Sequence, residues 1–138
     1  MKVTMEPQSN FPKAQEFYST VEYYSEIQPS DIVFSAYEND DIIGVVRIAP
    51  ENGSLVLRGM MIAPSHQRKG IGTLMIKELE KSIGDQDCYC IPHDWLEGFY
   101  GQIEFKKIVD NEAPQHLQER ILENRKKYPH LIMMKRSV

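Results

Sequence analysis

The stretch Gln67-Arg68-Lys69-Gly70-Ile71-Gly72 stands between an expected strand and an expected helix, and it decides how the whole chain is interpreted. The first N–H groups of a helix have no partner inside the helix and lie at the positive end of its dipole, so such a junction attracts anions. Gly70 and Gly72 let a phosphate approach the backbone closely. Arg68 and Lys69 add positive charge there. The stretch therefore predicts a pyrophosphate-binding loop.

Regular elements are expected on both sides of this loop. Before it, β-rich runs at residues 31–37, 42–48 and 54–62 are separated by turn residues, which indicates an antiparallel meander. After it, an amphipathic helix is expected to end at Gly84, with an apolar stripe formed by Ile71, Leu74, Met75, Leu79 and Ile83. A buried strand at residues 88–91 then predicts a parallel crossover with the run at 54–62.

The remaining elements complete an α/β order. We expect a strand at residues 3–5, one or two helices within 11–27, a short helix at 94–100 and strands at 103–109 and 131–134. A further helix is expected to begin at Pro114, with Leu117, Ile121 and Tyr128 facing inward.

Length and composition exclude several classes of protein. The chain has 138 residues, and 16 basic against 20 acidic residues give a net charge of −4, which argues against a general nucleic-acid binder. No stretch approaches the roughly 20 apolar residues that span a membrane, and no signal-peptide core is present. With two cysteines and no visible linker, we expect a single cytoplasmic domain over residues 1–138.

Two well-known phosphate-binding loops do not match the stretch. No string in the chain has the Walker A order of Gly, four residues and Gly-Lys-Ser/Thr. The dinucleotide fingerprint Gly-x-Gly-x-x-Gly fails because Met75 stands at its third glycine.

The stretch does match the pattern Gln/Arg-x-x-Gly-x-Gly/Ala, and here the chain resembles the GCN5-related N-acetyltransferase (GNAT) superfamily. Met60-Met61-Ile62 stands where the family pairs a strand end with pantetheine, five residues before Gln67. The segment at residues 99–105 is similar to the family's Phe-Tyr-x-x-x-Gly-Phe, with Tyr100 in the tyrosine position. The resemblance spans residues 31–109, and loosely the whole chain.

The resemblance implies both a fold and an activity. The fold is a GNAT-like mixed α/β one, a mostly antiparallel twisted sheet with a central parallel pair splayed for the cofactor and flanked by helices. The activity is transfer of an acetyl group from acetyl-CoA to a primary amine of a small molecule, with no metal. Two alternatives stay open, a protein or peptide N-acetyltransferase and a non-catalytic CoA-binding sensor. A homodimer is also open, and neither nucleic acid nor membrane is expected as a partner.

The resemblance also implies roles for particular residues. Tyr100 would protonate the departing thiolate, although a half-buried core tyrosine is the alternative. An amide of Met61 or Ile62 would stabilise the oxyanion. The implied cofactor-binding residues are Met60, Met61, Ile62, Gln67, Arg68, Lys69, Gly70, Ile71, Gly72 and Thr73.

Three positions depart from the family pattern. Val56 stands where some members carry a glutamate base, so water or another residue must take the proton. Glu104 replaces the usual glycine before Phe105, which puts the turn geometry in question. His93 replaces a frequent asparagine; it would contact the cofactor, orient the acceptor or act as base through a water, or else simply cap the short helix.

Two other features, a charged residue in a strand and a pair of cysteines, suggest further sites. Arg58 lies in an apolar run, so it needs a partner, either a carboxylate or phosphate of the acceptor or a structural salt bridge. Cys88 and Cys90 near His93 suggest zinc or a nucleophilic thiol. Both ideas are disfavoured, because no second ligand pair has the right spacing and a buried strand explains the cysteines.

Overall fold

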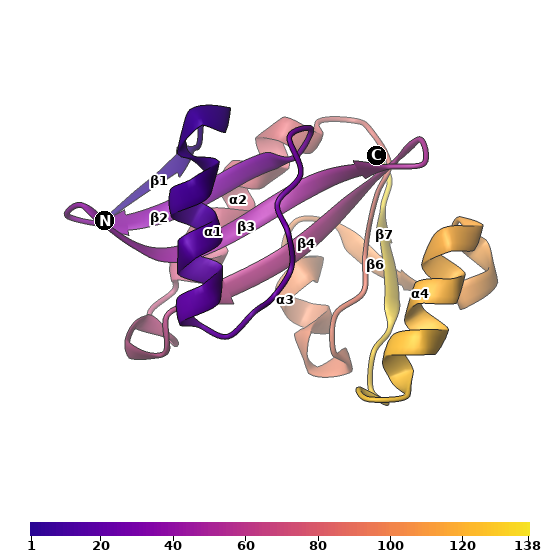
Figure 1. Ribbon diagram of the computed structural model, residues 1–138. Helices are drawn as coiled ribbons and strands as arrows, with labels where there is room; N and C mark the ends of the chain where they lie inside the picture. The colour runs from indigo at the N-terminus through magenta and orange to yellow at the C-terminus, as the bar shows by residue number, and fades with distance from the viewer. The chain divides into compact units, whose positions relative to one another are not determined.

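The computed structural model describes every residue from Met1 to Val138. Its strands are β1 Lys2–Met5, β2 Ile32–Glu38, β3 Asp41–Glu51, β4 Ser54–Ile62, β5 Cys88–Cys90, β6 Phe105–Ile108 and β7 Met133–Arg136. Its α-helices are α1 Phe11–Thr20, α2 Ile71–Ile83, α3 Glu97–Gly101 and α4 Gln115–Arg125 (Figure 1). Single 3₁₀ turns, labelled η1 to η4, occupy Gln8–Asn10, Pro64–His66, Asp94–Leu96 and Asp110–Glu112.

The strands form one sheet in the order β1-β2-β3-β4-β5-β7-β6. β4 and β5 are parallel, with Leu55 opposite Cys88 and Val56 opposite Tyr89. The pairs β1–β2, β2–β3, β5–β7 and β6–β7 are antiparallel. The predicted mixed, mostly antiparallel sheet with one parallel pair is therefore confirmed.

The chain divides into two compact units, which we describe separately. The first unit comprises residues 1–49 and 57–82, and the second comprises residues 50–56 and 83–138. Folding of residues 1–138 as a single domain stays a prediction.

In the first unit, helices cover both faces of the strands (Figure 1). Ala14, Phe17 and Tyr18 of α1 pack in one buried cluster with Val33 and Val45. The neighbouring residue Gly44 faces the other way, because side chains alternate along a strand. A Cβ atom at Gly44 would lie 2.9 Å from the sulfur of Met75 in α2. The absent side chain lets α2 approach β3 closely.

One helix lies within residues 11–27 as predicted, whereas the apolar stripe predicted for α2 was wrong at one position. The helical segment ends at Thr20, and residues 23–28 are neither helix nor strand, because the Gln15 side chain binds the backbone of Ser25 and Ile27 instead. In α2, Leu74 is half exposed while Ile76 is fully buried. Residues four apart drift by about 40° around a helix, which turns the stripe from Leu74 toward Ile76.

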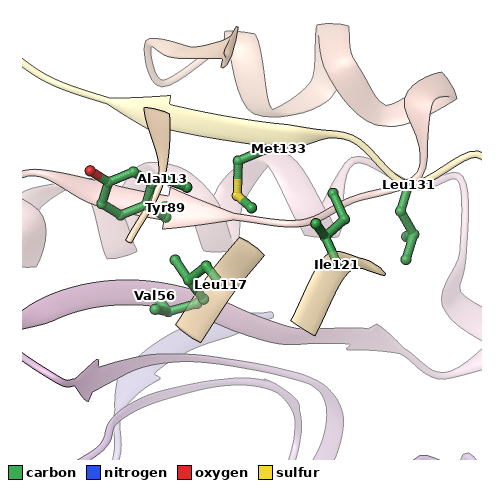
Figure 2. Close-up of a cluster of buried hydrophobic side chains, with 7 residues drawn as sticks. All are labelled: Val56, Tyr89, Ala113, Leu117, Ile121, Leu131 and Met133. Atoms are coloured by element: carbon green, nitrogen blue, oxygen red, sulfur yellow. The ribbon is translucent and has the colours of Figure 1, made fainter. Parts of the chain in front are cut away.

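In the second unit, α4 packs over a buried apolar cluster (Figure 2). Leu117 and Ile121 face inward as predicted. Tyr128 does not, because α4 ends at Arg125 and the Tyr128 side chain is 44% exposed. The last strand also begins later than predicted, at Met133. The cluster consists of Val56, Tyr89, Ala113, Leu117, Ile121, Leu131 and Met133. None of the helices in the chain is both long and apolar enough to span a bilayer.

Candidate functional site

The predicted phosphate loop lies directly before α2, and two of its residues adopt the left-handed backbone conformation. Arg68 and Gly70 have φ of 64° and 78°, one left-handed residue on each side of Lys69. Left-handed residues beside right-handed ones point successive N–H groups into one concave site, which binds anions. Residues 67–70 are exposed, and the amides of α2 begin immediately after them. The local geometry fits the predicted pyrophosphate-binding loop.

Side chains tie this loop to its neighbours in the first unit. The Gln67 amide donates to the Ile62 carbonyl at 3.2 Å, which joins the loop to the end of β4. His66 lies 3.1 Å from the Glu38 carboxylate and 2.8 Å from the Ser65 hydroxyl. The hydrogen bond to His66 lowers the pKa of Glu38, and the charges of His66 and Lys69 act in the same direction.

The end of β4 carries the residues predicted to face pantetheine. Met60, Met61 and Ile62 are half-buried, and Met61 packs against the cluster beneath α1. Just before them, Gly59 has φ of 66°, and its carbonyl accepts a hydrogen bond from the Tyr18 hydroxyl at 2.8 Å. A left-handed glycine inside a strand is typical of a bulge, which redirects the amides that follow.

Tyr100 lies in the second unit, on α3. It is only 5% exposed, and its ring meets Phe99 edge-on at 4.9 Å and lies 6.1 Å from Phe105. Tyr100 is thus more deeply buried than the half-buried position that the sequence suggested as an alternative. Glu104 has φ of 72°, so the glutamate adopts the left-handed conformation that the family's glycine favours.

His93, also in the second unit, sits among aromatic rings. It occupies the position before the 3₁₀ turn Asp94–Leu96, but its side chain makes no capping hydrogen bond, so the capping alternative was wrong. Its ring stacks on Trp95 at 4.3 Å and meets Tyr128 edge-on at 5.6 Å. Trp95 is 66% exposed. No sequence signal linked His93 to Tyr128, because the two segments are joined by backbone contacts between distant residues, such as the bridge between His93 and Leu131.

The sequence reasoning missed a buried polar network in the first unit. Arg47 of β3 is 1% exposed, and its Nε lies 3.1 Å from an Asp31 carboxylate oxygen. Its other nitrogens donate to Ser25 at 2.6 Å and to Tyr18 at 3.2 Å. The sequence signal for this network is a charged residue inside an apolar run, and Arg47 shares that signal with Arg58. Arg58 itself is half-buried in β4.

The two cysteines are free thiols buried in β5. Burial raises the pKa of Cys90 well above its ordinary value, which is the opposite of what an activated nucleophile needs. No group of three or more His, Cys, Asp or Glu side chains gathers where it would hold a metal ion.

Comparison with known proteins agrees with this geometry. The model of the acetyltransferase (GNAT) family matches residues 3–105. The chain belongs to this family. It is an acyl-CoA-dependent N-acetyltransferase, and the resemblance noted in the sequence is confirmed. No curated protein matches this acetyltransferase by sequence.

Solved structures share the fold of this acetyltransferase at low sequence identity. Escherichia coli ElaA superposes with a TM-score of 0.69 and 14% identity, over 99% of each chain. An aminoglycoside 6′-N-acetyltransferase complexed with coenzyme A gives 0.68 and 14%, over 99% of this chain and 96% of the other. N-acetylglutamate synthase from Neisseria gonorrhoeae, complexed with coenzyme A and N-acetyl-glutamate, gives 0.70 and 10%, over 99% of this chain and 35% of the synthase.

Proposed function

We propose that this acetyltransferase moves the acetyl group of acetyl-CoA directly to the primary amine of a small molecule. The observation that carries the acetyl-CoA part of the proposal is the pair of left-handed residues, Arg68 and Gly70, directly before α2. The amides from Arg68 to Gly72 hold the pyrophosphate, Arg68 and Lys69 supply charge, and Thr73 adds a hydroxyl in the first turn. Net acidity of the whole chain does not oppose this, because binding depends on local groups.

The pantetheine arm is assigned to the end of β4. Its two amides pair with the backbone of Met60, Met61 and Ile62 as an added strand would. The Gln67–Ile62 hydrogen bond supports this assignment, because it links the phosphate loop to this strand end. An amide of Met61 or Ile62 stabilises the oxyanion that forms when the amine attacks the thioester carbon.

Proton transfer completes the reaction. An alkylamine has a pKa of about 10, so a base must remove its proton before attack. Val56 cannot be that base, because its hydrocarbon side chain accepts no proton, and it lies in the apolar cluster beneath α4. We assign the step to water, with His93 as the side chain that orients it. As the carbon–sulfur bond breaks, Tyr100 gives its proton to the thiolate.

A hollow of about 600 Å³ in the first unit supports a small amine as acceptor. Its walls are α1 and the segment that follows α1, and the lining residues include Phe11, Tyr23, Tyr24 and Glu26. Aromatic faces and a carboxylate together attract an ammonium group. Tyr23 packs against the same cluster as Met61. Arg58 would bind an acidic group of the acceptor.

The phosphate loop is tested with two matched glycine substitutions at opposite ends of α2. Gly70 and Gly84 have φ of 78° and 60°, and an added methyl group would meet nothing within 4 Å at either position. Gly70→Ala and Gly84→Ala therefore carry a similar backbone cost of about 1 kcal/mol. We expect only Gly70→Ala to weaken binding of coenzyme A, by about tenfold or more, in calorimetric titration. Equal affinity in both variants would contradict the assignment of the loop.

The acceptor class is tested by thiol release. Acetyl-CoA is incubated with small amines, with amino-terminal peptides and with lysine peptides, and free coenzyme A is followed. We expect release with a small amine and a large loss of that release in Tyr100→Phe. Release with peptides alone indicates a protein acetyltransferase. Binding of coenzyme A without release from any acceptor indicates a sensor.

A further inference from the structure

The backbone at Gly59 is shaped around two side chains from elsewhere in the first unit. A Cβ atom at Gly59 would lie 2.3 Å from the Tyr18 hydroxyl oxygen and 2.7 Å from Nη1 of Arg47. Side chains of other residues essentially never tolerate such distances, so only glycine fits both the space and the φ of 66°. Tyr18 comes from α1 and Arg47 from β3, so three elements converge on this one residue of β4.

The hydrogen bonds of the Tyr18 hydroxyl have only one possible arrangement of donors and acceptors. Tyr18 is fully buried, and its hydroxyl has one proton, which it donates to the Gly59 carbonyl at 2.8 Å. The same hydroxyl oxygen accepts from Arg47 at 3.2 Å. Burial raises the pKa of Tyr18, so the phenol keeps its proton. Arg47 cannot exchange roles with it, because a guanidinium only donates.

Arg47 is itself held by the segment between α1 and β2. Its Nη2 donates to the Ser25 hydroxyl at 2.6 Å, and its Nε lies 3.1 Å from Asp31. Asp31 also accepts from the backbone N–H of Gln28 at 2.9 Å. Arg47, which contacts Tyr18 beside Gly59, is therefore held by several polar contacts, and these contacts restrict its rotation.

A fixed carbonyl fixes the amide on the other side of the same peptide bond. No cis peptide bond occurs in the chain, so the Gly59 C=O and the Met60 N–H point in opposite directions. While Tyr18 holds the carbonyl, the Met60 N–H points away from Tyr18. Met60 is the first residue of the strand end assigned above to the pantetheine arm, so its amide direction bears on cofactor binding.

We propose that Tyr18, held by Arg47, is a positioning residue that sets the Gly59–Met60 peptide and thereby orients the amides of β4 that bind the pantetheine arm of coenzyme A. The inference rests on the proposed function, because it assumes that coenzyme A lies along residues 60–62. It adds a role for a buried network that does not touch the cofactor.

The test removes one hydroxyl and compares the result with a matched variant. Tyr18→Phe deletes the donor to Gly59. Tyr37→Phe deletes another engaged hydroxyl in the same unit, bound to Glu6 at 2.7 Å and Asn10 at 3.0 Å, with no partner on β4 among these contacts. Affinity for coenzyme A is measured by calorimetry at a temperature where circular dichroism shows both variants folded. We expect Tyr18→Phe to bind about tenfold more weakly and Tyr37→Phe to bind like the parent protein.

Each outcome separates the inference from the proposed function. If the parent protein binds coenzyme A and folded Tyr18→Phe binds it equally well, the positioning role is overturned and the proposed function stands. If the parent protein does not bind coenzyme A, both are overturned. If Tyr18→Phe does not fold, Ser25→Ala replaces it, because this change removes only one acceptor of Arg47. A folded Ser25→Ala protein should then bind coenzyme A more weakly, and unchanged affinity would overturn the inference.

Discussion

Single residues in this acetyltransferase show that the local environment decides what a side chain does. Arg47 and Arg58 both stand in apolar β-rich runs, yet only Arg47 is almost fully buried, at 1% exposure. Burying an unpaired charge is very costly, and the Arg47 guanidinium is paired with the Asp31 carboxylate and donates hydrogen bonds to Ser25 and Tyr18. The charge inside β3 is therefore a structural anchor.

Glu104 offers a test at the scale of one residue. Its φ of 72° is costly for a side chain with a Cβ atom and nearly free for glycine. Because the side chain is exposed, Glu104→Gly should lose no packing and raise the free energy of unfolding by up to about 1 kcal/mol. Urea denaturation measures the change. Glu104→Ala keeps the Cβ atom and should show no such gain; a less stable glycine variant would refute the strain argument.

The apolar face of each helix in this chain determines how that helix packs. In α2, Ile71, Met75, Leu79 and Ile83 repeat every four residues, and the stripe they form runs toward Ile76 and away from Leu74. In α4, only Leu117 and Ile121 are buried, and the rest of the surface is polar or exposed. The helix depends on those two side chains for its attachment to the sheet.

Two leucines of α4 test this dependence. Leu117 is fully buried in the cluster shown in Figure 2, whereas Leu122 is 63% exposed. Leu117→Ala should lower the free energy of unfolding by about 2–5 kcal/mol, because it removes apolar contacts and leaves a cavity. Leu122→Ala serves as the control and should change it by less than about 0.5 kcal/mol. Thermal unfolding followed by circular dichroism compares them, and similar losses in the two variants would argue against the burial of this face.

At the scale of the whole molecule, several tyrosine and cysteine side chains hold their protons more tightly in the fold than in the unfolded chain. Burial raises the pKa of Tyr37 to about 12, and its hydrogen bond to Glu6 acts in the same direction. Burial also raises the pKa of Tyr18 and of Cys90. The unfolded chain therefore releases these protons at lower pH than the folded protein does.

This difference predicts loss of stability in alkali. In an unfolded chain a cysteine ionises near 8.5 and a tyrosine near 10. The stabilisation from these groups is complete below those values and declines as the pH rises through them toward the folded pKa, about 12 for Tyr37. Urea midpoints measured from pH 7 to 11 should therefore fall at the upper end. Tyr37→Phe should show a smaller fall than the parent protein, and an equal slope in both would contradict the role of Tyr37.

The sequence alone determined the family and most of the sheet, and it predicts the phosphate loop. These follow from local patterns: glycines at residues 70 and 72, an apolar period in the helix after them, and β-rich runs separated by turns. Gly84 was expected at the end of α2 and has the left-handed φ of 60°. Such features need only neighbouring residues, so they can be recognised before the chain is folded.

Only the tertiary structure decided which distant side chains meet. The contact of Tyr18 with Gly59 spans 41 positions, and the edge-on contact of His93 with Tyr128 lies beside an isolated bridge between His93 and Leu131. The end of α1 at Thr20 and the exposure of Leu74 likewise depend on what packs against each face. The spacing of apolar residues along a helix indicates which face is apolar, but the packing of other elements decides how much of that face is buried.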